Sequence, residues 1–419
     1  MRSLAKWIVV VSCLAMAACA EPLSTSDSGG AKLPPLVVIP DVDPGELLQA
    51  ELQSYWDWPL VLPAGERIVR LYRLDEKLYC LTNMNTLVAI NAQVGKEEWR
   101  RSIAPIGQAV FAPTHVNDIV LPEEVVGIEG IVDPSTIRAS APFDAVMINS
   151  LSYVMVLDRK DGAVIRNPKD VRFDFAANTS GASDGVMFFV GSVNGRYYGM
   201  DLVAGVMAWQ EGTGAIISSG LKYVNEHLYV AGEDGVFYTD KITTGREFDW
   251  SQQLGGPVTA DFYVGDNQCF VPCEDKRLYA YGALNGQQIW PPFVTSGKLR
   301  TPVQVAPQTI FQYAQGDRLY AIDRLTGEKR WDMPDGRTVL AAMEGKAYVL
   351  DKEKMMHVVD EMTGEEIATV DMSRLDLLLA NTTAPAIFAA GKDGKLYCFR
   401  LLSAGRLTPE MLEAGEVSR

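Results

Sequence analysis

The stretch LYAIDRLTGEKRW, residues 319–331, recurs along this 419-residue chain. Clear copies are LVAINAQVGKEEW (87–99), YYGMDLVAGVMAW (197–209), FYTDKITTGREFDW (237–250) and LYAYGALNGQQIW (278–290), and weaker copies are YVMVLDRKDGAVI (153–165), MHVVDEMTGEEIA (356–368) and LYCFR (396–400). The turn glycines of successive copies are Gly95, Gly162, Gly205, Gly245, Gly286, Gly327 and Gly364. Their separations are 67, 43, 40, 41, 41 and 37 residues, which indicates a repeat of about 40 residues with one insertion.

Each copy contains short strands separated by turns. In residues 257–290, the runs 257–263, 268–271, 277–281 and 287–290 predict four strands. Glycine, asparagine and aspartate fill the turns between them, as tight hairpins require. Four short antiparallel strands in about 40 residues are typical of a propeller blade, and closure of the ring protects the strand edges. The sequence therefore predicts an all-β fold, a single β-propeller with four-stranded antiparallel blades.

The number of inner hairpins predicts eight blades, and seven blades with an appendage is the alternative. Because the eighth copy lacks its Gly-Trp strand, we expect the N-terminal segment to supply a strand that closes the ring. Residues 36–39 and 58–62 are candidates, and we favour 58–62 because it directly precedes blade one. Asp43-Pro44-Gly45-Glu46 predicts the start of a short helix at 47–52. A second candidate helix covers 409–414.

The cleanest copy carries the pattern Ala321-x-Asp323-x-x-Thr326-Gly327-x-x-x-Trp331, which resembles the repeat of quinoprotein-like propellers, also called PQQ repeats after pyrroloquinoline quinone. The resemblance covers roughly residues 66–401. It implies that the tryptophan ending each outer strand docks onto the neighbouring blade, where the Thr-Gly turn receives it. The docking residues would be Trp99, Trp209, Trp250, Trp290 and Trp331, and the seven repeat glycines would form the turns. From the residues alone, a buried indole adds apolar area and its N–H needs an acceptor.

The first residues are a targeting signal. Arg2 and Lys6 precede an apolar stretch, residues 7–18, which is shorter than the roughly 20 residues that span a bilayer. The sequence Met16-Ala17-Ala18-Cys19 resembles the bacterial lipobox and predicts lipidation of Cys19, with ordinary cleavage near Ala18 as the alternative. Residues 21–35 are polar and rich in Ser, Gly and Pro, as in a flexible tether. We expect a lipid-anchored cell-envelope protein, held at the outer membrane and facing the periplasm.

These signals give an expected organisation along the chain. It comprises a signal peptide at 1–18, a lipidated tether at 19–35, an N-terminal segment with the helix and closing strand at 36–65, the propeller at 66–401 with an insertion at about 121–142, and a C-terminal tail at 402–419. Lys and Arg total 38 against 53 Asp and Glu, a net charge of −15. Such an acidic chain repels phosphate backbones, which argues against a nucleic-acid partner.

No catalytic residues are predicted. PQQ-dependent dehydrogenases share this repeat but carry adjacent cysteines and a calcium site, and this chain has no Cys-Cys pair. We therefore expect no enzyme activity and no cofactor, PQQ included. His115, His227 and His357 lie in different repeats without metal-ligand spacing, so no metal site is predicted. Cys80 and Cys398 lie in the first and last repeats, where a disulfide is possible and buried thiols are favoured.

The insertion is the irregular feature of the array. It carries Val125, Val126, Ile128 and Ile131 beside acidic residues, which is typical of a contact with a partner protein, although an extra strand pair covering its own blade is the alternative. The lipobox, tether and eight repeats together resemble the BamB family, the lipoprotein subunit of the β-barrel assembly machinery. That resemblance implies a non-catalytic scaffold with envelope protein partners. A propeller lipoprotein that binds another protein or a glycan is the second possibility, and a PQQ-dependent dehydrogenase is the third.

Overall fold

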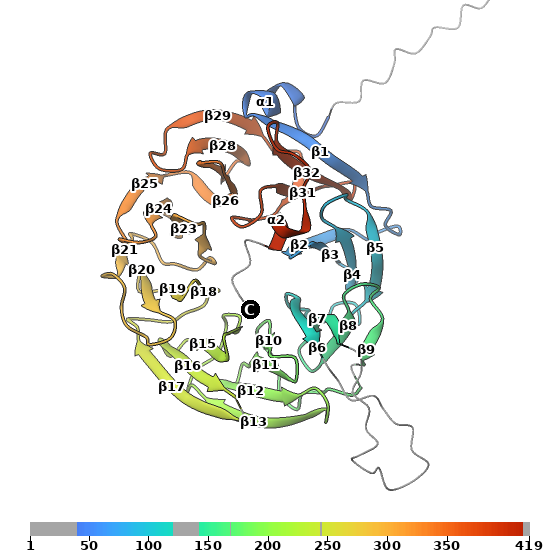
Figure 1. Ribbon diagram of the computed structural model, residues 1–419, viewed down its shortest axis with the longest axis vertical. Helices are drawn as coiled ribbons and strands as arrows, with labels where there is room; N and C mark the ends of the chain where they lie inside the picture. Colours follow the sequence, from blue (N-terminus) through green and yellow to red (C-terminus); the bar gives the residue numbers. More distant parts are fainter. Residues whose placement is uncertain (1–39, 120–141, 168, 244, 414–419) are drawn as a thin grey trace, which may run out of the picture. The chain divides into compact units, whose positions relative to one another are not determined.

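The computed structural model describes residues 40–119, 142–167, 169–243 and 245–413. From Pro40 onward these residues form one compact unit. Its described strands make eight four-stranded antiparallel sheets arranged as blades around a central axis (Figure 1). The all-β, eight-bladed prediction is confirmed, and the seven-bladed alternative is wrong.

The blades follow chain order, each with its first strand nearest the axis (Figure 1). Blades one to four contain β2 (Ile68–Leu74), β3 (Lys77–Thr82), β4 (Thr86–Asn91), β5 (Glu97–Ser102); β6 (Thr114–Ile119), β7 (Phe143–Asn149), β8 (Val154–Asp158), β9 (Val164–Arg166); β10 (Ala182–Ser183), β11 (Met187–Gly191), β12 (Arg196–Asp201), β13 (Val206–Gly212); β14 (Lys222–Val224), β15 (His227–Ala231), β16 (Val236–Ile242), β17 (Arg246–Gln253). Blades five to eight contain β18 (Tyr263–Gly265), β19 (Gln268–Cys273), β20 (Arg277–Gly282), β21 (Phe293–Val294); β22 (Gln304–Val305), β23 (Thr309–Tyr313), β24 (Leu319–Asp323), β25 (Lys329–Met333); β26 (Gly336–Met343), β27 (Lys346–Asp351), β28 (Met355–Asp360), β29 (Glu366–Asp371); β30 (Leu375–Leu378), β31 (Ile387–Gly391), β32 (Lys395–Leu401), β1 (Leu52–Pro59).

Burial follows each strand's distance from the rim. The second strand of blade one, β3, is buried at every position, whereas no residue of the outer strand β17 is fully buried. The middle strands are buried because both faces of a blade pack against neighbouring blades. One apolar cluster, for example, joins Phe270 of blade five to Ile310 of blade six. The core is therefore a series of layers between blades.

Strand β1 closes the ring by pairing antiparallel with β32, from Leu52 opposite Leu401 to Pro59 opposite Lys395. A closing strand from the N-terminal segment was predicted, but our preferred position, 58–62, is wrong because the strand begins at Leu52. Pro59 ends it, since proline has no N–H to continue the ladder. The other candidate, 36–39, lies outside the described residues.

Two short helices flank this closure. Helix α1 (Pro44–Gln49) lies slightly earlier than predicted and begins at the expected cap, because the Asp43 side chain accepts hydrogen bonds from the N–H groups of Gly45 and Glu46. Helix α2 (Pro409–Glu413) lies within the range 409–414 expected for it. Leu407 and Leu412 of the C-terminal segment are buried between blades eight and one, in a cluster with Leu71 and Phe388. Both segments thus brace the point where the ring closes.

Five tryptophans dock between blades in one common geometry. In each, the indole lies against a turn glycine of the next blade, where an added Cβ would come within 2.5 to 2.7 Å of the ring. The pairs are Trp56–Gly95, Trp99–Gly162, Trp250–Gly286, Trp290–Gly327 and Trp331–Gly364. These glycines have φ between +63° and +74°, a backbone conformation that strains other residues.

The indole N–H usually reaches the carbonyl three residues before the receiving glycine. Trp56 donates to Ala92 at 2.9 Å, Trp99 to Arg159 at 3.0 Å and Trp331 to Glu361 at 2.9 Å. Trp250 is the exception, because the Tyr229 hydroxyl donates to the corresponding carbonyl, that of Ala283. The Trp250 indole N–H is consequently buried without a hydrogen-bond partner among the described residues.

The joint between blades three and four is built differently. Trp209 lies over Gly199 of its own blade, where a Cβ would be 2.3 Å from the indole, and nothing lies within 4 Å of the Cβ position at Gly245. Gly245 also has no positive φ, because this hairpin is longer and Ile242 pairs with Arg246. A polar lock replaces the docked indole: the buried Asp240 carboxylate accepts from the Tyr197 hydroxyl at 2.6 Å and from Arg246 at 2.8 Å. Burial raises the pKa of Asp240 above its usual value.

The structure also shows the outer strand of blade five and the state of the cysteines. The outer strand of blade five is β21, not 287–290, and only an isolated bridge joins Gln288 to Tyr281. Pro291 and Pro292 interrupt the run after Trp290, since neither can donate a ladder hydrogen bond. Cys80, Cys269, Cys273 and Cys398 are all buried free thiols. The favoured reading of Cys80 and Cys398 as buried thiols is therefore confirmed.

Candidate functional site

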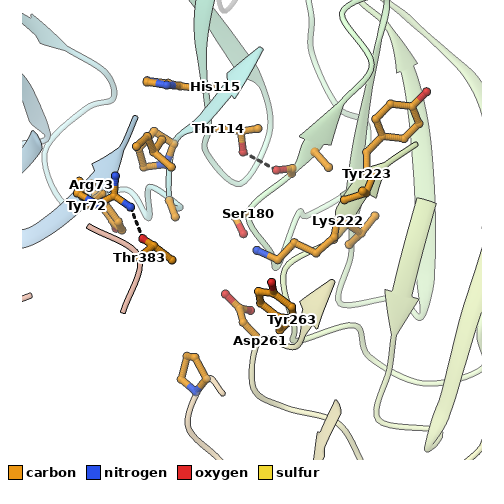
Figure 2. Close-up of a pocket in the computed structure, with 18 of the residues that line it drawn as sticks. Tyr72, Arg73, Thr114, His115, Ser180, Lys222, Tyr223, Asp261, Tyr263 and Thr383 are labelled. Carbon is orange, nitrogen blue, oxygen red and sulfur yellow. Dashed lines mark hydrogen bonds between the residues drawn. The ribbon is translucent and has the colours of Figure 1, made fainter. Parts of the chain in front are cut away.

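A cavity of about 830 Å³ lies where the inner strands meet. Its walls come from the first strands or adjoining loops of blades one to six, together with residues 379–383 of blade eight. Because these segments are far apart in the sequence, only ring closure brings their side chains together. Figure 2 shows the polar side chains that border this cavity.

One wall gathers polar groups from three consecutive blades. Ser180, Lys222 and Asp261 extend toward the same space, with Tyr263 beside them (Figure 2). The Gly220 N–H donates to Asp261 Oδ1 at 2.6 Å and fixes that carboxylate. A Cβ at residue 220 would lie 2.5 Å from Ser180 Oγ and 3.2 Å from Asp261 Oδ1, so this close approach depends on a glycine.

The opposite wall is held by Arg73 and the loop that follows β30. Arg73 donates to the Thr383 hydroxyl and to the Leu412 carbonyl, the latter at 2.8 Å (Figure 2). Thr382 donates to the Val305 carbonyl of blade six at 2.7 Å, and the Asn381 N–H donates to the Val339 carbonyl of blade seven at 3.3 Å. The loop therefore reaches from blade eight to blades one, six and seven, and fixes one side of the cavity.

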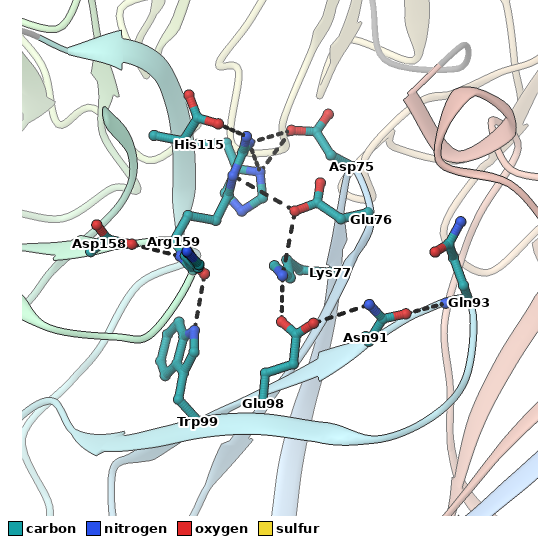
Figure 3. Close-up of polar contacts among 12 residues, drawn as sticks. Asp75, Glu76, Lys77, Asn91, Gln93, Glu98, Trp99, His115, Asp158 and Arg159 are labelled. Carbon is teal, nitrogen blue, oxygen red and sulfur yellow. Dashed lines mark hydrogen bonds and ion pairs between the residues drawn. The ribbon is translucent and has the colours of Figure 1, made fainter. Parts of the chain in front are cut away.

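His115 also borders the cavity, but its ring takes part in a buried polar network (Figures 2 and 3). Nε2 lies 2.8 Å from the Tyr79 hydroxyl, and Nδ1 lies 2.8 Å from Asp75 Oδ2. Burial, followed by the nearby Arg159 cation, lowers the pKa of His115 to about 3. The ring is therefore neutral at neutral pH, with Nδ1–H donating to Asp75 and Nε2 accepting from Tyr79.

The same network fixes the start of β7. Arg159 contacts Asp75 at 3.0 Å and Asp144 at 2.5 Å, and it lies 3.7 Å from Glu76 (Figure 3). Asp144 is at the start of β7, just beyond the insertion, and Asp75 and Glu76 are in the first turn of blade one. A second hollow of about 410 Å³ adjoins these charges. The network thus ties the start of β7 to the neighbouring blade.

Exposed apolar side chains mark the turns before the outer strands. The second position before the turn glycine is occupied by Leu284, Leu325 and Met362 in blades five to seven. Their exposed fractions are 52%, 77% and 49%. Val203 occupies the same position in blade three and is also exposed. Because strands alternate in direction, these turns lie at the end of the ring where β6 ends and β7 begins.

The predicted site residues fall into two groups. Trp99, Trp250, Trp290 and Trp331 dock onto the next blade as predicted, whereas docking of Trp209 is wrong because it lies over Gly199 of its own blade. Among the described residues, no indole lies against Gly205 or Gly245. The predicted site residues Cys19, Val125, Val126, Ile128 and Ile131 lie outside the described residues. No helix among the described residues has the length and apolar character to cross a membrane. Within the same ranges, no cluster of three or more His, Cys, Asp or Glu side chains is arranged to hold a metal ion.

The polar wall of the cavity was not predicted from the sequence, although the repeat contains a signal for it. Ser180, Gly220 and Asp261 each lie seven residues before the second strand of their blade. Lys222 and Tyr263 lie five residues before it, so they too share one phase of the repeat. Comparing copies at these inner-strand positions, rather than at the outer turn, would have identified the residues that face the axis.

Comparisons with known proteins agree with this architecture. Residues 193–334, from blade three to the end of blade six, match the family model described as outer membrane protein assembly factor BamB. The structure resembles BamB from Moraxella catarrhalis, with a TM-score of 0.59 and 14% identity over 84% of this chain and 99% of that one. The chain is therefore similar to BamB in its propeller fold and in the PQQ-type repeats of residues 193–334.

A computationally designed protein, Ika8, also shares the fold, with a TM-score of 0.54 and 14% identity over 79% of this chain and 95% of that one. No curated protein matches the sequence. The BamB model covers the blades with the clearest repeats, which include Trp209, Trp250, Trp290 and Trp331. The insertion in blade two lies outside the matched span.

Proposed function

We propose that this chain is a non-catalytic scaffold of the cell envelope that assists the assembly of outer-membrane proteins, as the BamB-like propeller suggests. The observation that carries the proposal is the structural similarity to BamB along 99% of that chain, together with the family match. In this proposal the lipid on Cys19 holds the ring at the outer membrane, and the residues that follow act as a tether. The ring serves as a rigid mount for loops that bind a partner protein.

We assign the partner to the end of the ring that carries the turns before the outer strands, called the turn end below. It carries the exposed apolar residues Leu284, Leu325 and Met362. Apolar side chains on turns fixed by docked indoles are suited to protein contact, because little entropy is lost when they are covered. Their position on several consecutive blades favours a broad partner surface over a small ligand.

Co-purification with the barrel-assembly complex tests this proposal. We expect the chain with Cys19 intact to recover barrel-assembly subunits from solubilised envelopes, and Cys19→Ser to lose membrane attachment and most of that recovery. Leu325→Asp should reduce recovery several-fold. The matched control is Val61→Asp, because Val61 is equally exposed, at 79% against 77%, and lies at the opposite end of the ring, beyond the end of β1.

Three outcomes would count against the proposal. The first is that the intact chain recovers no barrel-assembly subunit. The second is that Val61→Asp and Leu325→Asp reduce recovery equally, which would rule out the turn end as the contact surface. The third is that Cys19→Ser stays in the membrane fraction, which would contradict the lipid anchor.

A further inference from the structure

The polar wall of the central cavity contains donor and acceptor atoms that make no hydrogen bond or ion pair within the described part of the ring. Ser180 Oγ, Lys222 Nζ and Asp261 Oδ2 have no hydrogen bond or ion pair with any residue in the described ranges. The ammonium of Lys222 lies more than 4.0 Å from every described carboxylate, even though Asp261 borders the same space. A cation and an anion therefore face one cavity without neutralising each other (Figure 2).

The arrangement is fixed in advance of any ligand. The Gly220 N–H holds one Asp261 oxygen at 2.6 Å and leaves the other oxygen directed elsewhere. Lys222 and Tyr263 extend from β14 and β18, first strands that pack between neighbouring blades. A second carboxylate on this side, Asp184, is held by its own turn through Oδ1, which accepts from the N–H groups of Val186 and Met187. Lys222 therefore supplies the positive charge of this wall, and Asp261 and Asp184 supply its negative charges.

The rest of the cavity suits a small organic molecule. Its volume of about 830 Å³ falls within the range of roughly 300–1,000 Å³ that is usual for ligand pockets. Leu71, Val303 and Leu379 contribute apolar surface around the polar groups. Pockets of this kind combine apolar walls with a few placed polar groups that orient the ligand.

We propose that the central cavity binds a small zwitterion of the amino-acid or short-peptide type, with its carboxylate at Lys222 and its ammonium at Asp261. A purely anionic ligand would place negative charge beside Asp261, and a purely cationic ligand would place positive charge beside Lys222. A zwitterion satisfies both groups, and its side chain can occupy the apolar wall. Ser180 and Tyr263 supply hydroxyls for the remaining polar atoms. This inference does not depend on the proposed envelope partner.

Calorimetric titration of the purified full chain tests the proposal with three related probes. The dipeptide glycyl-phenylalanine carries both charges, glycyl-phenylalanine amide lacks the carboxylate, and N-acetyl-glycyl-phenylalanine lacks the ammonium. We expect the dipeptide to bind about tenfold or more tightly than either analogue, because each analogue loses one charge-assisted contact. The bound dipeptide should also leave recovery of barrel-assembly subunits unchanged.

Two variants assign the contacts separately. Lys222→Met should abolish the preference for the dipeptide over its amide and keep the preference over the acetylated form, and Asp261→Asn should do the reverse. Lys241→Met is the matched control, since Lys241 is an exposed lysine of the same blade. Thermal unfolding checks that each variant is folded. The proposal is overturned if the dipeptide shows no saturable binding, or if neither folded variant changes the order of the three affinities.

Discussion

Gly162 and Gly245 occupy the same phase of the repeat but have different surroundings. At Gly162 φ is +69° and a Cβ would lie 2.6 Å from the Trp99 indole, whereas Gly245 has no positive φ and, among the described residues, no atom within 4 Å of its Cβ position. The two glycines therefore play different structural roles although they align in the sequence.

This difference predicts unequal costs of adding a methyl group. Gly162→Ala should lower the free energy of unfolding by about 2–4 kcal/mol, because it adds backbone strain and displaces a packed indole. Gly245→Ala should change it by less than about 0.5 kcal/mol. Urea denaturation of the two variants measures both values. Equal destabilisation would contradict the docking geometry.

The carboxylate of Glu274 makes the free energy of unfolding depend on pH in the acid range. Its carboxylate accepts from Arg300 Nε and Nη2, each at 2.8 Å, and from Lys298 at 2.9 Å. The hydrogen bonds from Arg300 contribute most, and they lower the pKa of Glu274 to about 2. A pKa lowered by folding gives stability that is complete above the unfolded-state value near 4.3 and is lost as the pH falls toward 2.

We therefore expect Glu274→Gln to destabilise the chain by roughly 1 kcal/mol at pH 7, a value kept modest because both partner cations are largely exposed. The difference should shrink as the pH falls from about 4.5 to 2, and urea titrations at several pH values will measure it. Lys352→Gln is a control, because its ion pair with Asp335 is exposed on both sides. A difference that persists unchanged at pH 2 would argue against this role of Glu274.

At the scale of elements, strand β1 stabilises two blades, eight and one, although it lies near the start of the chain. It supplies the outer strand of blade eight, opposite β32, and its Trp56 docks onto Gly95 of blade one. Without it, β32 would present an unpaired edge and the joint between blades eight and one would lose its indole.

Two truncations separate this role from that of the preceding residues. A chain that begins at Pro40 should unfold at the same urea concentration as the full chain. A chain that begins at Leu60 should lose cooperative unfolding or aggregate, as size-exclusion chromatography and urea denaturation would show. Trp56→Ala in the longer chain should cost about 3 kcal/mol. Normal stability of the chain beginning at Leu60 would mean that the ring does not need this strand.

At the scale of the whole molecule, the ring has joints of two kinds. Most described joints contain a docked indole, but blade two ends with Ile165 in place of tryptophan, and Trp209 of blade three stays on its own blade. Asp240, Tyr197 and Arg246 form the lock between blades three and four, and the outer contact of Arg246 with Glu211 is half exposed. The half-exposed pair contributes little and no indole of the described residues docks at this joint, so we expect this part of the ring to be the weaker one.

We expect the ring to open locally at this joint before it unfolds. In native-state hydrogen exchange, the amides of β13 that bond to β12 should show a lower opening free energy than those of β25 that bond to β24, because Trp331 anchors β25 to the next blade. Asp240→Asn should widen the gap. Equal protection of β13 and β25 would show that the polar lock holds as firmly as an indole.

The sequence by itself determined the repeat and the all-β fold and favoured eight blades over seven, because every blade must bury the same faces and so repeats the same residues at the same phase. It also indicated that an N-terminal strand completes blade eight, since one outer strand was missing. It did not place that strand, because the pairing of Leu52 with Leu401 spans almost the whole chain and carries no local signal.

Only the tertiary structure decided which copies of the repeat depart from it and what the axis contains. Trp209 packs on its own blade, whereas Trp250 docks onto the next blade. This difference depends on Gly199 and on the longer hairpin at Arg246, and neither cause is visible in a single copy of the repeat. The cavity joins Ser180, Lys222 and Asp261 from three blades, and their proximity follows from ring closure. Local patterns specify strands and turns, whereas contacts across the axis depend on how many blades close and on which side chains each inner strand turns inward.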